Sequence, residues 1–176
     1  DGKMHQIKAM DIPFGKFRDK GLPIDNISNY DSTKEQIAYI CDSEQLRFAK
    51  LLFVTKQGMV KKVEGAEFQV AKRTIAATKL QEGDEIAAVD VVTDNQHIVL
   101  QSKEGYFLRF PAEEVPEKKK GAVGVRGMKL RKKDELAHAY LLEEGADAKA
   151  MHGEKEVALS RLKIAKRDGT GTKTRV

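Results

Sequence analysis

The chain has 176 residues, of which 40% are hydrophobic and 34% charged, with 32 Lys plus Arg, 27 Asp plus Glu and a single cysteine. This balance is typical of a soluble globular protein, and the absence of any run of six apolar residues excludes a membrane span and a signal-peptide core. Cys41 alone makes neither an intrachain disulfide nor a zinc site, so we expect a cytoplasmic protein in which it is a small buried residue. A chain that begins with Asp1 instead of Met is expected to be a piece of a longer protein.

Apolar and β-branched runs predict strands, in chain order, over 51–55, 59–63, 85–92 and 135–142. Gly58 lies in the short turn between the first two, where glycine accepts a positive φ without strain. No window longer than about ten residues has the i, i+3, i+4, i+7 spacing of an amphipathic helix. The chain is therefore predicted to be all-β.

The sequence repeats itself. Residues 51–63 align with 98–110 at a spacing of 47, which matches Gly58 with Gly105, and residues 79–86 align with 129–136 at a spacing of 50. The approximate copies are 1–48, 49–96 and 97–150, followed by a degenerate tail, 151–176. Several strands per copy at a period near 50 favour propeller-like blades over helical repeats. We expect about three blades plus fragments in a single domain, 1–176.

Positive charge is concentrated in two regions. Residues 115–133 carry eight basic side chains against one acidic, and 154–176 carry seven against three. One basic segment recurs in each copy, at Lys16, Arg18 and Lys20; Lys72 and Arg73; Lys118, Lys119 and Lys120; and Lys163, Lys166 and Arg167. If the copies circle with a constant rotation, these side chains fall on one curved edge suited to the phosphates of double-stranded DNA. A solvated basic face is the alternative that charge alone leaves open.

Four segments carry a resemblance to a known family: "LLFVTKQGMVKKV", "KLQEGDEIAAV", "YFLRFPAEEVPEKKKGAVGVRGMKL" and the tail "SRLKIAKRDGTGTKTRV". They resemble the C-terminal domain of the A subunit of bacterial type IIA topoisomerases, DNA gyrase and topoisomerase IV. The resemblance implies a β-pinwheel, here partial or open, whose basic rim binds and bends DNA and presents a segment for ATP-dependent strand passage. Arg126, in the glycine-rich stretch after the basic run, is a further candidate DNA-binding residue, which could reach either a phosphate or a strand carboxylate.

The same resemblance implies which partners and cofactors belong elsewhere. The partners are double-stranded DNA, the N-terminal cleavage domain that precedes this one in its parent, and the ATPase B subunit. ATP and magnesium are expected only in other parts of the parent enzyme, with no cofactor, metal site or catalytic residue in this fragment. Gyrase has a box close to Q-R-R-G-G-K-G, and the nearest segment here, Lys118–Gly124, differs at Ala122 and Val123. Gyrase and topoisomerase IV therefore both stay open.

Two interpretations compete with DNA binding. The first is a non-enzymatic interaction propeller whose basic rim docks an acidic protein. The second is an enzyme, for which the recurring pairs Asp84–Glu85 and Asp134–Glu135 are the paired carboxylates. Recurrence in two copies favours a structural turn role for these pairs, because an enzyme needs one site.

Overall fold

The computed structural model describes residues 1–174, and nearly all of its regular structure is β-strand. The strands are β1 (Lys3–His5), β2 (Lys50–Thr55), β3 (Met59–Glu64), β4 (Thr74–Ala76), β5 (Ile86–Val92), β6 (His97–Ser102), β7 (Tyr106–Pro111), β8 (Val125–Arg126), β9 (Leu136–Leu142), β10 (Lys149–His152), β11 (Lys155–Ala158) and β12 (Thr172–Lys173). The helical elements are α1 (Ser43–Leu46) and the short 3-10 turns η1 (Ala9–Asp11), η2 (Ile24–Asn26), η3 (Gly65–Phe68), η4 (Ala112–Glu114) and η5 (Leu159–Arg161). The strands expected from the sequence are confirmed.

Two four-stranded antiparallel sheets form the centre of the molecule. Their orders are β5-β2-β3-β8 and β9-β6-β7-β12, each built around one hairpin. The outermost strand comes from the following repeat: β8 pairs with β3, and β12 pairs with β7. In the same way β4 pairs with β1. This exchange of strands between neighbouring copies links each sheet to the next.

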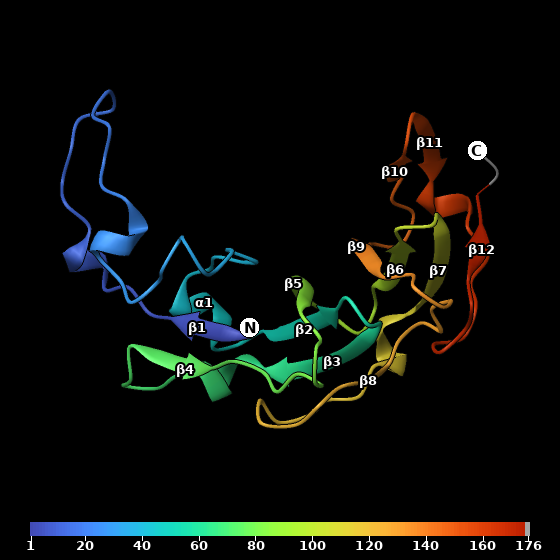
Figure 1. Ribbon diagram of the computed structural model, residues 1–176, viewed down its shortest axis with the longest axis horizontal. Helices are drawn as coiled ribbons and strands as arrows, with labels where there is room; N and C mark the ends of the chain where they lie inside the picture. Colours follow the sequence, from blue (N-terminus) through green and yellow to red (C-terminus); the bar gives the residue numbers. More distant parts are fainter. Residues whose placement is uncertain (175–176) are drawn as a thin grey trace.

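The sheets follow one another along an open arc (Figure 1). The inner strands β5 and β9 lie towards the concave side, and β4, β8 and β12 lie towards the convex side. The two-stranded sheets β1–β4 and β10–β11 stand at opposite ends of the arc and do not meet. The fold is therefore an open series of blades.

Both faces of each central sheet are buried, which explains the continuous apolar runs. In β2, Leu52 and Val54 pack towards the second central sheet, whereas Leu51 and Phe53 pack towards the β1–β4 end. Successive strand residues point to opposite faces, so a strand covered on both sides needs apolar residues at consecutive positions. Strand β6 repeats the arrangement, since Leu100 faces the first sheet and Val99 faces β10–β11.

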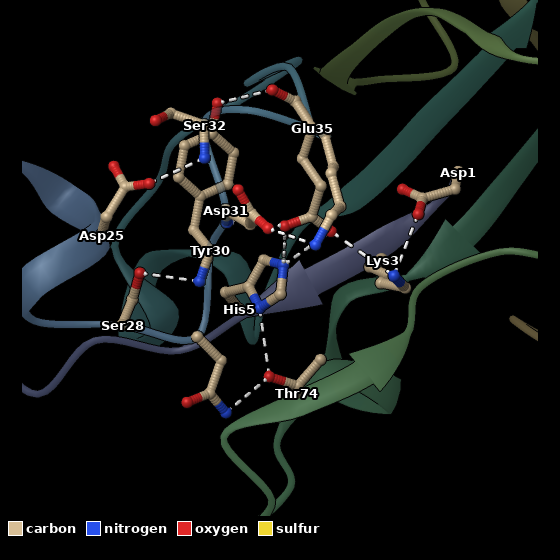
Figure 2. A network of polar contacts seen from close by, with 12 residues as sticks. Asp1, Lys3, His5, Asp25, Ser28, Tyr30, Asp31, Ser32, Glu35 and Thr74 are labelled. Atoms are coloured by element: carbon tan, nitrogen blue, oxygen red, sulfur yellow. Dashed lines mark hydrogen bonds and ion pairs between the residues drawn. The ribbon is translucent and has the colours of Figure 1, made fainter.

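A polar network fastens the N-terminal segment to the sheet β1–β4 (Figure 2). His5 Nδ1 lies 3.0 Å from the Thr74 hydroxyl, and its Nε2 lies 3.1 Å from the Glu35 carboxylate. The Tyr30 hydroxyl donates to the Glu35 carbonyl at 2.9 Å, and the Asp31 main-chain N–H donates to the Glu35 carboxylate at 3.0 Å. The Asp31 N–H, followed by His5, lowers the pKa of Glu35. This network gives an irregular segment a defined position.

Cys41 is exposed in the stretch before α1, so its expected burial is wrong. The absence of strand pairing explains the difference, because the residues between Tyr39 and α1 join no sheet. Among residues 1–174, no helix is long and apolar enough to cross a bilayer.

Candidate nucleic-acid interface

Three of the four basic segments precede an outermost strand. Lys72 and Arg73 lead into β4, residues 118–120 precede β8, and residues 163–167 precede β12. Because these three strands line the convex side (Figure 1), the segments follow one curved border. We call this border, with its basic residues Lys72, Arg73, Lys118, Lys119, Lys120, Lys163, Lys166 and Arg167, the outer edge.

The structure does not bring the first basic segment to the outer edge. Lys16, Arg18 and Lys20 lie in an irregular loop that projects from the N-terminal end of the arc (Figure 1, blue). Phe14 and Phe17 in this loop are fully exposed, and within residues 1–174 no strand pairs with it. The expectation of a common edge therefore fails for these three residues, since their copy contributes no exchanged outer strand here.

Each outer-edge segment is tied to an acidic residue in the 3-10 turn of the preceding copy. The Arg167 main-chain N–H donates to the Glu114 carboxylate at 2.7 Å, and the Arg167 guanidinium donates to the Glu114 carbonyl at 2.9 Å. At positions 47 residues earlier, the Lys120 main-chain N–H and ammonium bond the Glu67 carboxylate and carbonyl, both at 3.0 Å. A further copy earlier, Arg73 lies 3.6 Å from Asp11. We call these three contacts the inter-copy clamps.

The clamps divide the predicted contact residues into two groups. Lys120 and Arg167 are occupied in fixing the loop, and Arg126 forms a bidentate ion pair with Asp168. Lys119 also lies 3.1 Å from Glu67, but its side chain stays 85% exposed. The pKa of Glu67 is lowered mainly by the hydrogen bond from the Lys120 main-chain N–H, so the clamp carboxylate is charged at neutral pH. The second group consists of basic side chains that extend from the clamped loops and form no ion pair with any residue in 1–174. Its members are Lys72, Lys118, Lys163 and Lys166.

A buried lysine supports the central basic segment from beneath. Lys61 in β3 is 2% exposed, and its ammonium donates to the carbonyl oxygens of Lys119 and Lys120, both at 3.1 Å, and of Ala122, at 2.6 Å. Burial lowers the pKa of Lys61 to about 8, with the charge of Glu67 opposing the shift. Sequence reasoning missed this residue, because a lysine in an exposed-looking Lys-Lys pair carries no signal of burial.

The clamp carboxylates were also missed, although the sequence held a signal for them. Glu67 and Glu114 recur at the same spacing of 47 as the basic residues that they bind. An acid and a base that repeat in register indicate a contact between copies.

The paired carboxylates shape turns, as their recurrence predicted. Asp84 accepts from the main-chain N–H groups of Gln57 at 3.0 Å and Glu85 at 2.8 Å. Asp134 accepts in the same way from Glu104 and Glu135. No cluster of three or more His, Cys, Asp or Glu residues in the described chain could hold a metal ion.

Comparison with known proteins identifies the family. A family model of the DNA gyrase C-terminal domain, described as a beta-propeller, matches residues 49–93 and 96–143. The chain belongs to the DNA gyrase C-terminal domain family. Each matched range begins with the hairpin of one central sheet and ends with the inner strand of that sheet.

Relatives and solved structures agree with this assignment. The DNA gyrase A subunit of Lawsonia intracellularis (strain PHE/MN1-00) is 36% identical over 152 residues, 85% of this chain, and that of Chlamydia pneumoniae is 36% identical over 137 residues, 76% of this chain. The crystal structure of the C-terminal domain of DNA topoisomerase IV superposes with a TM-score of 0.84 at 26% identity over 97% of this chain. The DNA gyrase A C-terminal domain, at 24% identity and a TM-score of 0.72, shares the fold. The expected β-pinwheel is confirmed.

The chain covers only part of these proteins. It spans 18% of the Lawsonia protein, 16% of the Chlamydia protein and 55% of the topoisomerase IV domain.

Proposed function

We propose that this domain binds duplex DNA along the outer edge and bends it, as part of the A subunit of a bacterial type IIA topoisomerase. The observation that carries the proposal is the repeated placement of basic segments before β4, β8 and β12, each tied by an inter-copy clamp. A row of cations on a convex border contacts successive phosphates only if the duplex follows the curvature.

The mechanism is electrostatic. Bending a site of 20–30 base pairs costs on the order of 1–6 kcal/mol, which phosphate contacts and counterion release offset. Because the clamps fix the loop main chain, the lysines extend from a border that is already curved. The bent duplex would present a second segment to the N-terminal cleavage domain for strand passage driven by ATP in the B subunit. ATP and magnesium would act in those other parts, in the cytoplasm, and this domain would add no catalytic group or cofactor.

A salt titration tests the proposal. For about six neutralised phosphates, the plot of log affinity against log salt concentration should have a slope near −5. Energy transfer between dyes at the two ends of a duplex of about 40 base pairs should rise on binding, since bending brings the ends together. A flat salt dependence, or tight one-to-one binding of a single acidic protein with weak DNA binding, would contradict the proposal and favour an interaction propeller.

A further inference from the structure

The turn before the innermost strand differs in charge between the two central sheets. Residues 81–83 before β5 are Gln, Glu and Gly, whereas the equivalent residues 131–133 before β9 are Arg, Lys and Lys. The main chain is the same in both, since Asp84 N–H donates to the carbonyl of residue 81 at 3.1 Å and Asp134 N–H to that of residue 131 at 3.0 Å. One turn is thus acidic and the other carries three positive charges on a common backbone.

Lys133 occupies a conformation that glycine normally takes. Its φ is 70°, equal to the φ of Gly83 at the equivalent position. A left-handed conformation is strained for a residue with a Cβ. Backbone strain of this kind concentrates at functional sites. Placing a lysine where a glycine fits better therefore points to a use for its charge.

Two cations from separate segments meet at the same end of the second sheet. The Arg131 guanidinium lies 4.3 Å from the centre of the Tyr106 ring, and the Lys173 ammonium lies 5.4 Å from it. Tyr106 is nearly buried and pairs with Lys173 across β7 and β12. Cation–π contact orients both side chains without neutralising their charge.

All but one of the acidic residues near the turn 131–133 already have hydrogen-bond or ion-pair partners. Glu135 bonds Lys103 at 2.6 Å, and the Asp134 carboxylate accepts two main-chain N–H groups. Glu104 remains exposed beside the turn. In residues 1–174, Lys132 and Lys133 form no ion pair and Arg131 pairs with no carboxylate. We call Arg131, Lys132, Lys133 and Lys173 the tip cluster.

We propose that the tip cluster is a second phosphate-binding surface, which carries duplex DNA off the outer edge and across the end of the second sheet. The inference rests on the proposed function and adds a path to it. Lys173 belongs to the outermost strand β12, and the turn 131–133 leads into the innermost strand β9. The cations therefore extend from the outer edge towards the concave side, at one sheet only. Their contacts would go to phosphates and carry no sequence preference.

The two turns supply their own test. Exchanging Arg131→Gln, Lys132→Glu and Lys133→Gly gives the second turn the sequence of the first, which already adopts this backbone. The free energy of unfolding should stay equal or rise. In fluorescence anisotropy titrations of a labelled duplex with the full chain, affinity should fall roughly 10- to 100-fold and the salt slope should become shallower by about 2–3. Lys173→Gln alone should make the slope shallower by about 1.

A control removes the same charge elsewhere. Lys34→Glu with Lys149→Glu lowers the net charge by the same four units at two lysines that belong to neither surface and that pair with Asp31 and Glu156. Two results would show that the tip cluster is not a DNA-binding surface while leaving the proposed function intact. The first is that this control weakens binding as much as the turn exchange does. The second is that the turn exchange leaves affinity and salt slope unchanged while a variant of the outer edge weakens binding. If the unaltered chain shows no salt-dependent DNA binding, the proposed function itself fails.

Discussion

Lys120 and Glu67 bind each other through both main chain and side chain. The Lys120 N–H donates to the Glu67 carboxylate and the Lys120 ammonium donates to the Glu67 carbonyl, each at 3.0 Å. Glu114 and Arg167 repeat the arrangement in the following copy. A basic residue in such a clamp sets the path of its loop, and the neighbouring lysines are left to meet the phosphates.

Removing one clamp carboxylate should loosen its loop. Glu114→Ala deletes the acceptor of the Arg167 N–H, and we expect the free energy of unfolding to fall by about 1–2 kcal/mol. Hydrogen exchange at the Arg167 amide should accelerate, because its partner becomes water. The control is Glu113→Ala, an exposed neighbour outside the clamp. Equal exchange at Arg167 in both variants would contradict the clamp.

Removing charge from the outer edge should weaken DNA binding without unfolding the domain. The triple variant Lys119→Gln, Lys163→Gln and Lys166→Gln should make the salt slope shallower by about 3, because each lysine accounts for roughly one phosphate. The matched triple variant Lys3→Gln, Lys34→Gln and Lys149→Gln removes the same charge elsewhere. Anisotropy titrations at several salt concentrations measure both, and similar slopes in the two variants would count against the edge.

Lys61 should give the stability an alkaline pH dependence. Its pKa is about 8 in the fold against an ordinary 10.5, so between these values the unfolded chain binds more protons. The cost of burying the ammonium is then fully present below pH 8 and disappears as the pH rises towards 10.5. Relative to Lys61→Met, the wild-type protein should gain up to about 3 kcal/mol across this window. Urea denaturation of both proteins from pH 7 to 10 measures the difference, and parallel curves would refute the lowered pKa.

Gly65 allows two segments to approach closely. A Cβ at this position would lie 1.7 Å from the Leu46 carbonyl oxygen and 2.7 Å from that of Ala49, so the backbone itself must move. We expect Gly65→Ala to lower the free energy of unfolding by at least about 3 kcal/mol. Gly121→Ala is the control, because nothing lies within 4 Å of the added carbon, and it should change stability by less than about 0.5 kcal/mol. Comparable denaturation midpoints for the two variants would contradict this packing.

The strands with long apolar runs were predictable because their signal is local. Residues 51–55 and 59–63 are β-branched or apolar and flank Gly58, and the structure has β2 and β3 there. The repeat also predicted that the basic segments share one curved edge, which holds for three of the four. The exchange of strands follows from the resemblance to a β-pinwheel and not from the residues themselves, because β8 and β12 have two residues each and no alternating pattern.

Burial on both faces of a sheet was the other obstacle. In β3, Lys61 and Lys62 are adjacent and both about 2% exposed, although adjacent strand residues point to opposite faces. Charged residues in a strand normally indicate a face exposed to solvent. Here the carbonyl oxygens that accept from both ammonium groups belong to neighbouring loops, so the strand sequence alone does not indicate them. The position of the loop with Lys16 was not predictable either, because within residues 1–174 no strand pairs with this loop and its sequence does not show that.

Strand exchange also sets the order in which the sheets can be completed during synthesis. As the chain leaves the ribosome, the hairpin β2–β3 emerges with its outer flank unpaired until Val125 and Arg126 arrive to cover it. The hairpin β6–β7 waits in the same way for Thr172 and Lys173. An unpaired edge strand can pair with a strand of another chain and cause aggregation. During synthesis, therefore, each newly completed blade leaves one unpaired edge strand until the next copy supplies its outer strand.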